Sequence, residues 1–369
     1  MAQDSAQEAI SLERQGRNAE AEAAWAAVAR EHPGSAEPFA HLGLLEARQE
    51  HYADAIASYK KAMALDPAMP RLRFNLGLAY FKGGDYREAI REFSPLLKAE
   101  PGDQGLTILM GMSHYGLDEF AAAAPFLKQA AERDPQNLPL LLALAHSCLL
   151  SQQYQCVLDE FHRIVALNPE SAEAHMLAGE ALDQMKDTAG AIRELRAAVV
   201  ANPKEPNVHF GLGYLLWTQG HTQDAAREFQ AELDNYPENA QAMLYLADSL
   251  IQMNRMQDAL PLLEKVESIN PANAMGHLDL GIVYSEAGRN EDALRELKQA
   301  ATLKPGDVNA HYRLGRLYRS MGRNAEAKAE FDKSKSLNKA ADEGLIKAMS
   351  RVPPPDNATH GTVTAPAVR

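Results

Sequence analysis

The sequence predicts an all-α fold in which ten helix-turn-helix units follow one another along the chain. Nine prolines recur at a constant spacing of 34 residues, helix-capping residues recur beside them, and small and large side chains occupy fixed positions between them. This is the pattern of a stacked repeat array, and it contains no insertion or deletion. The ten repeats are residues 2–35, 36–69, 70–103, 104–137, 138–171, 172–205, 206–239, 240–273, 274–307 and 308–341.

The start of the first helix in each repeat is marked by its capping residue. Side chains of Ser, Asp and Asn accept hydrogen bonds from backbone N–H groups that the first helical turn leaves unpaired. At two junctions Pro70 and Pro206 follow an uncapped position, and we expect them at the first helical position, where no N–H is needed. The other seven junctions carry Ser35, Asp103, Asn137, Ser171, Asn239, Asn273 and Asp307.

The turn between the two helices of a repeat is marked by residues that tolerate the left-handed conformation. The periodic proline then ends the second helix, because it cannot donate the hydrogen bond that a further turn would need. The turn residues are Gly16, Gly84, Asp118, Gly220, Asn254, Gly288 and Gly322.

The two helices of a repeat are predicted to pack closely, because the eighth position is Gly or Ala in every repeat from the second to the tenth. A glycine inside a helix costs roughly 1 kcal/mol relative to alanine. Its recurrence therefore indicates that the neighbouring helix leaves no room for a larger side chain. Large residues fill the twenty-fourth position instead: Trp25, Tyr59, Phe93, Phe161, Phe229 and Phe331.

This pattern resembles the tetratricopeptide repeat family, most clearly in residues 76–101, "LGLAY...GGDYREAIREF...P". The resemblance covers residues 2–341. It implies a right-handed superhelical solenoid with a concave inner surface that binds partner proteins. The departures are local: Glu8 replaces an apolar residue, Val157 a small alanine, and Lys339 the proline of the last repeat.

The C-terminal segment is expected to cap the array. Residues 342–352, "DEGLIKAMSRV", carry Leu345, Ile346 and Met349 at near-helical spacing, which predicts an extra helix over the last exposed core face. Residues 353–369 have no apolar periodicity and are expected to be disordered.

Composition excludes several classes of function. The formal charge of −13 and pI near 5.4 argue against nucleic-acid binding, which depends on clustered Lys and Arg. The most apolar run, residues 138–150, is too short for membrane insertion, which needs about 20 apolar residues. The start of the chain lacks a signal peptide, so we expect a cytoplasmic protein. The alternative is a periplasmic or secreted protein whose signal peptide preceded "AQD".

No catalytic, cofactor or metal site is expected. The "GMSHYG" stretch at 111–116 has its second glycine one residue too late for a nucleophile elbow. Gly211 and Gly213 lack the third glycine of a dinucleotide loop, because residue 216 is Leu. Four histidines share the fourth position of their repeats and are expected at helix packing contacts rather than in a cluster: His175, His209, His277 and His311.

The two cysteines, Cys148 and Cys156, have no metal-ligand spacing. Cys148 falls at a packing position, and Cys156 falls where other repeats carry Glu or Asp. We therefore expect them to face different environments as inert thiols.

Positions 5, 9 and 12 of the repeats form a stripe on the first helices. The resemblance places this stripe on the concave surface, and aromatic side chains often dominate protein interfaces. The alternative is that these residues only extend the core. Asp248 and Asp279 flank the stripe, which would suit a partner helix or peptide with basic residues. The candidate contacts are Phe74, Leu78, Phe81, Ile108, Met112, Tyr115, Leu142, Leu149, Phe210, Tyr214, Trp217, Leu244 and Ile251.

The tenth repeat differs by carrying Arg313, Arg316 and Arg319, which form a candidate patch for an acidic partner. A solvated end face or weak self-association are the alternatives. The sequence thus predicts a non-catalytic adaptor that binds a peptide or helix of a partner protein. A structural subunit of a cell-envelope complex, acting through self-association, is the alternative function.

Overall fold

The computed structural model describes residues 2–349, and within that range all regular structure is α-helical. Two helices fall in each of the ten predicted repeats, as expected for paired helices. The helices are α1 (Ala2–Arg14), α2 (Asn18–Glu31), α3 (Ala36–Arg48), α4 (Tyr52–Leu65), α5 (Leu72–Lys82), α6 (Tyr86–Ala99), α7 (Gln104–Gly116), α8 (Phe120–Arg133), α9 (Leu138–Leu150), α10 (Tyr154–Leu167), α11 (Ala172–Gln184), α12 (Thr188–Ala201), α13 (Val208–Thr218), α14 (Thr222–Asn235), α15 (Ala240–Gln252), α16 (Met256–Ile269), α17 (Ala274–Glu286), α18 (Asn290–Leu303), α19 (Val308–Ser320) and α20 (Asn324–Met349).

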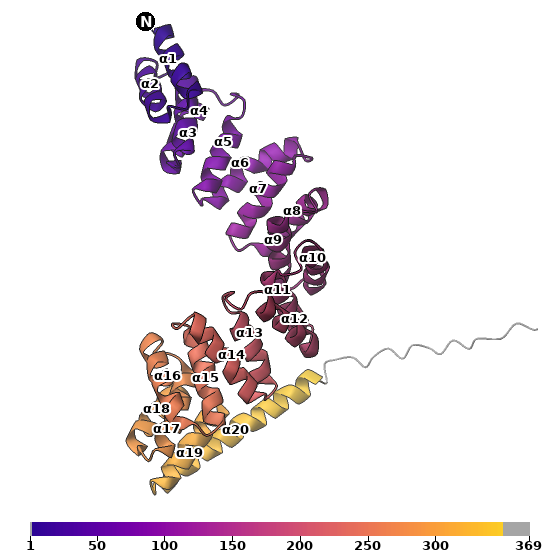
Figure 1. The fold of residues 1–369 in the computed structure, drawn as a ribbon. Helices are drawn as coiled ribbons and strands as arrows, with labels where there is room; N and C mark the ends of the chain where they lie inside the picture. The colour runs from indigo at the N-terminus through magenta and orange to yellow at the C-terminus, as the bar shows by residue number, and fades with distance from the viewer. Residues whose placement is uncertain (1, 350–369) are drawn as a thin grey trace, which may run out of the picture. The chain divides into compact units, whose positions relative to one another are not determined.

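The chain forms two compact units, Met1–Val208 and His209–Arg369. In the first unit each pair of consecutive helices from α1 to α12 packs together. In the second unit the same holds from α14 to α20, as the paired ribbons of Figure 1 show. Some first helices also touch the first helix of the next repeat, as α15 touches α17 and α17 touches α19.

The predicted caps are confirmed at six of the seven junctions. The side chains of Asp103, Asn137, Ser171, Asn239, Asn273 and Asp307 each accept a hydrogen bond from the first turn of the following helix. Ser35 precedes α3 in an extended conformation, but its side chain makes no capping hydrogen bond. The repeat boundaries are thus held largely by local hydrogen bonds.

The expectation for Pro70 and Pro206 was wrong, because α5 and α13 each begin two residues after the proline. Arg71 and Asn207 have φ values of 61° and 66°. The amide of Leu72 donates to the carbonyl of Met69, three residues earlier. This is the geometry of a type II turn, which favours proline at its second position and a positive φ at its third. The prolines therefore shape a turn before the helix.

The turn residues within the repeats behave as predicted. All five predicted glycines have φ between 71° and 84°, and Asp118 and Asn254 have φ values of 58° and 60°. Three repeats without a predicted turn residue place Glu50, Gln152 and Lys186 in the same conformation. The turn geometry is therefore shared by repeats whose turn residues differ.

The small eighth position is confirmed as a close packing contact. A Cβ atom built on Gly77 would lie 2.6 Å from the ring of Phe93, and one on Gly213 would lie 2.9 Å from Phe229. Both rings stand at the twenty-fourth position of the same repeat and are fully buried. The pairing of glycine with a large ring thus sets how closely the two helices of a repeat approach.

The expectation for the cysteines was wrong, because Cys148 and Cys156 form a disulfide. Cys148 lies in the last turn of α9 and Cys156 in the first turn of α10, with their Cα atoms 5.9 Å apart. The tight turn between these helices brings the end of one beside the start of the other. The bridge therefore closes the helix pair of the fifth repeat.

The separate capping helix is not seen, because residues 342–349 continue α20 without a turn. Lys339 stands where the other repeats have a helix-ending proline, so nothing stops the helix there. Residues 338–343 are exposed. The predicted tail, 353–369, lies outside the described residues.

None of the helices in the described range is long and apolar enough to cross a membrane.

Candidate functional site

Four aromatic side chains gather on the first helices of the seventh and eighth repeats. Phe210, Tyr214 and Trp217 come from successive turns of α13, and Tyr245 comes from α15. The Tyr245 ring lies 5.0 Å from Trp217, 5.4 Å from Tyr214 and 5.9 Å from Phe210. Tyr214 is 37% exposed and the other three are half-buried. We call these four residues the aromatic patch.

A hydrogen bond ties the patch to a carboxylate. The indole Nε1 of Trp217 donates to Oδ2 of Asp248 on α15 at 2.6 Å, and the Gln252 amide donates to the same oxygen. Burial raises the pKa of Asp248, and these two hydrogen bonds partly offset that rise. The other oxygen, Oδ1, accepts no hydrogen bond from the described residues. Asp248 therefore keeps one oxygen for another donor.

A second carboxyl group lies close to Asp248. Asp279 on α17 is only 2% exposed, and its Oδ2 has no hydrogen-bond partner among the described residues. Burial and the neighbouring charge of Asp248 hold the pKa of Asp279 well above its usual range, while Arg313 acts in the opposite direction. The ionised form of Asp248 therefore opposes the ionisation of Asp279.

A small cleft follows on the same series of first helices. It has a volume of about 90 Å³ and lies between α17 and α19. Arg313 and Arg316 line it together with Ser285, Ser320 and the exposed Glu286. Neither arginine forms an ion pair within the part of the chain that the structure describes. Arg319, the third member of the predicted patch, instead lies over the ring of Phe331.

The other predicted contact residues divide by burial. Leu149 and Leu244 are 6% and 5% exposed, so both are core residues and cannot present a surface to a partner. Here the alternative of an extended core was right. Those that stay partly exposed are Phe74, Leu78, Phe81, Ile108, Met112, Tyr115, Leu142 and Ile251.

Most of these partly exposed residues in the first unit pack against its core clusters. Tyr115 contacts His146 through a 2.9 Å hydrogen bond, so its hydroxyl is already engaged. Phe74 lines a cleft of about 570 Å³ that begins at Arg71, where α5 starts late. The aromatic rings of this first-unit surface, Phe74, Phe81 and Tyr115, are all less exposed than Tyr214 of the aromatic patch.

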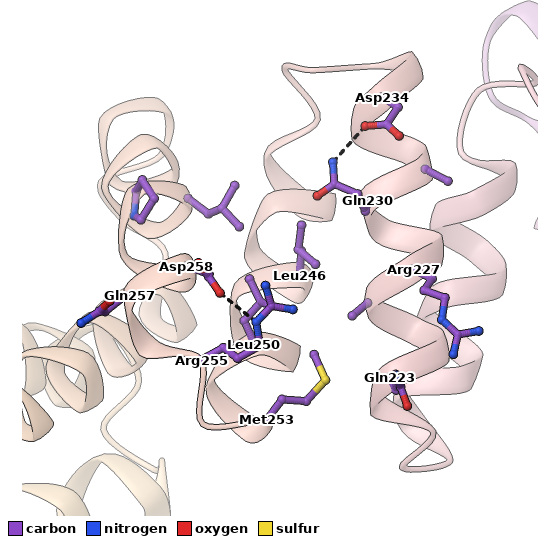
Figure 2. Close-up of a pocket in the computed structure, with 14 residues that line it drawn as sticks. Gln223, Arg227, Gln230, Asp234, Leu246, Leu250, Met253, Arg255, Gln257 and Asp258 are labelled. Atoms are coloured by element: carbon purple, nitrogen blue, oxygen red, sulfur yellow. Dashed lines mark hydrogen bonds and ion pairs between the residues drawn. The ribbon is translucent and has the colours of Figure 1, made fainter.

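A larger groove, on the second helices, was not predicted from the sequence. Figure 2 shows this groove, about 660 Å³, with α14 and α16 as walls and α15 as floor. Leu246, Leu250 and Met253 supply apolar floor atoms. Its charged rim residues are largely paired on their own helices, as Arg255 is with Asp258. The groove is thus apolar with locally neutralised charges.

Comparison with known families decides the kind of protein. One model of the tetratricopeptide repeat matches residues 7–70, 158–206 and 210–274. A second model of the same repeat matches residues 46–109, 254–301 and 284–341. Together they cover well over half of the chain. The chain belongs to the tetratricopeptide repeat family.

Solved structures of other tetratricopeptide proteins resemble parts of this one. MamA from Desulfovibrio magneticus RS-1 is 23% identical over 46% of this chain and 97% of its own, with a TM-score of 0.42. YrrB, described as a tetratricopeptide protein with an unusual peptide-binding site, is 19% identical over 52% and 98%, with a TM-score of 0.42. The Naa15/Naa10 complex bound to HypK-THB is 16% identical over 90% and 63%, also at 0.42. No curated protein matches the sequence.

The tetratricopeptide frame also explains the histidines. The Nδ1 atoms of His175, His209, His277 and His311 each lie 2.6–2.9 Å from a Glu 19 residues later, on the second helix of the same repeat. Their prediction as packing contacts is confirmed.

One of these histidine–glutamate pairs, His277 with Glu296, has a second glutamate beside it. Glu267, His277 and Glu296 place possible ligand atoms within 4.8 Å of one another. Both ring nitrogens of His277 already have partners, Oε2 of Glu296 and the Pro271 carbonyl, and Arg295 binds the other oxygen of Glu296. The same histidine pairing occurs in three other repeats, so the group is best explained as a buried hydrogen-bonded pair.

Proposed function

We propose that this tetratricopeptide protein is a non-catalytic scaffold that holds a segment of a partner protein against the first helices of its second unit. The aromatic patch is the observation that carries the proposal. Large rings on neighbouring helices provide contact area with little loss of side-chain freedom, and residues of this kind dominate many protein interfaces. The hydrogen bond from Trp217 to Asp248 on α15 also fixes the orientation of the indole ring.

The surroundings of the patch support a protein or peptide partner. Trp217 of the patch is bonded to Asp248, and the apolar, partly exposed Ile251 follows Asp248 by three residues on α15, so this surface offers both polar and apolar contacts. Recognition of a helix or an extended peptide needs this combination of anchor pockets and a polar margin. The acidic charge of the whole chain favours partners that are basic or neutral overall.

The test combines Trp217→Ala with Tyr214→Ala. Partners would be identified by crosslinking the intact chain in its own cells, followed by affinity isolation and mass spectrometry. The expected result is loss of the crosslinked partner with helicity unchanged by circular dichroism. A matched control replaces two exposed apolar residues on second helices of the same unit, Ile269→Ala with Leu303→Ala. Partner capture that survives in the patch variant would place the site elsewhere.

The disulfide favours a second candidate, a structural component of a cell-envelope assembly. Bridges such as Cys148–Cys156 persist in oxidising compartments and are rare in the cytosol. We therefore propose an oxidising compartment, such as the periplasm, as the setting in which this function would operate. Thiol labelling of the protein in intact cells, before any exposure to air, tests this. Full labelling of both cysteines would favour the cytoplasm.

Self-association belongs to this second candidate. Contacts made through the arginines of the tenth repeat would weaken with salt, because ions screen exposed charges. Sedimentation at high protein concentration in low and high salt tests it. A mass equal to one chain under both conditions would count against an assembly formed by this chain alone.

A further inference from the structure

We propose that the bound segment carries three kinds of side chain in a fixed order: an apolar or aromatic block, then a basic residue, then an acidic residue. The bound segment carries this order when it is read either from its N-terminus or from its C-terminus. These three parts contact the aromatic patch, Asp248 and the cleft of Arg313 and Arg316, respectively. The inference rests on the proposed function and specifies the partner that the same surface selects.

The basic position is assigned by the free oxygen of Asp248. Its Oδ2 is held by Trp217 and Gln252, while Oδ1 accepts no hydrogen bond from the described residues. Asp279 lies close enough for repulsion between the two carboxyl groups and has an unpartnered buried oxygen of its own. A cation beside Asp248 would pair with Oδ1 and stabilise the ionised form that burial disfavours. A Lys or Arg side chain of the partner supplies that cation.

The acidic position is assigned by the cleft between α17 and α19. Two guanidinium groups without an ion pair among the described residues, Arg313 and Arg316, line it with the hydroxyl groups of Ser285 and Ser320. Glu286 also lines the cleft, which leaves a net charge of +1. Its volume of about 90 Å³ corresponds to roughly three water molecules, enough for a carboxylate group. Arginine suits a planar carboxylate because its guanidinium can donate two parallel hydrogen bonds.

The order follows from the packing of the first helices. Trp217 on α13 reaches Asp248 on α15, α15 touches α17, and α17 touches α19. A segment that lies across these helices therefore meets the rings, the carboxylate and the arginines in this sequence. The groove on the second helices offers no such series, because its rim charges are largely paired on their own helices, as Arg255 is with Asp258. The residues that select the charged side chains of the partner are therefore those on the first helices.

The experiment is a selection of random peptides displayed on phage against the full chain, followed by affinity measurements on the enriched peptides. The expected peptides contain the three kinds of side chain in the stated order. Asp248→Asn should weaken an enriched peptide about tenfold, and the same peptide with its basic residue replaced by glutamine should lose no further affinity. Arg316→Ala should also weaken the peptide, and replacing the acidic residue of the peptide should then cause no further loss of affinity.

Two controls separate this inference from the proposed function. Arg255→Gln, in the groove on the second helices, should leave every affinity unchanged. If Trp217→Ala with Tyr214→Ala abolishes binding but the charge variants change it less than twofold, the charge order is wrong and the scaffold function stands. If the enriched peptides ignore the aromatic patch, or none is enriched, both proposals fail. Circular dichroism of each variant confirms that the chain remains folded.

Discussion

Trp217 and Asp248, 31 residues apart, are joined by a 2.6 Å hydrogen bond from the indole nitrogen to the carboxylate. The two residues belong to successive repeats, at the twelfth and ninth positions. The same offset joins the Tyr115 hydroxyl to His146 in the first unit. Contacts of this kind show that neighbouring first helices are coupled through polar groups as well as through their apolar cores.

Removal of the indole donor should change the titration of Asp248. Burial raises the pKa of this carboxyl, and the hydrogen bond from Trp217 lowers it. Trp217→Phe keeps an aromatic ring but loses the donor, so the pKa of Asp248 should rise further. Carbon-13 NMR of the side-chain carboxyl as a function of pH measures this. Tyr214→Phe is the control, and equal Asp248 pKa values in the two variants would contradict the expectation.

Asp279 should make the protein less stable as the pH rises. Its folded-state pKa lies well above the unfolded value of about 3.9, so between the two values the folded state binds a proton that the unfolded state has lost. Stability therefore falls across this window and levels off above the folded pKa. Asp279→Asn does not titrate, so its stability relative to the natural chain should increase with pH.

Thermal unfolding from about pH 5 to about pH 8 measures this difference, because the contributions of most other groups cancel between the two chains. Asp234→Asn, whose carboxyl accepts a hydrogen bond from Gln230 at the surface, serves as a control. A difference that stays constant or decreases with pH would show that the folded state holds no extra proton at Asp279.

Gly77→Ala should destabilise the first unit. The added methyl group would lie 2.6 Å from the Phe93 ring, and overpacking of this kind typically costs about 1–3 kcal/mol. The gain in helix propensity, about 1 kcal/mol, offsets only part of this cost. Urea unfolding measures the difference. Gly306→Ala, where an added methyl group meets nothing within 4 Å, should be close to neutral. Equal effects of the two substitutions would be inconsistent with close helix packing at Gly77.

Reduction of the disulfide should lower the stability of the first unit. Closing a loop between residues eight apart stabilises a protein by about 2–3 kcal/mol on the chain-entropy model. Thermal unfolding with and without a reducing agent measures the loss, and Cys156→Ser should reproduce it. The Cys156→Ser variant should not respond to the reducing agent. If it does, the effect arises elsewhere.

The local parts of the fold could be predicted from the sequence, because their physical causes are local. An Asn or Asp cap, a glycine in the left-handed conformation and a glycine facing a large ring each act within one repeat. Arg71 shows the limit of this reasoning. Its positive φ belongs to a turn formed by Met69 and Pro70, and proline is compatible with either that turn or a helix start.

The candidate site was less predictable, because it depends on contacts between repeats. The stripe included the α13 rings that form part of the aromatic patch, but it also included Leu244, which neighbouring helices bury. It missed Tyr245, which stands at the sixth position yet lies 5.0 Å from Trp217. The cleft at Arg313 depends on the separation of α17 and α19, which no single repeat encodes.

The bridge between Cys148 and Cys156 also has a mechanical consequence. Each repeat contacts mainly its neighbours, so a chain pulled from its two ends should release its repeats in succession. A repeat of 34 residues extends by at most about 120 Å when it unfolds. The oxidised fifth repeat would extend by roughly 20–25 Å less, since the eight residue steps between the cysteines stay at a Cα–Cα distance of 5.9 Å. A single short step in a force-extension trace would mark this repeat, and a reducing agent would restore its full length.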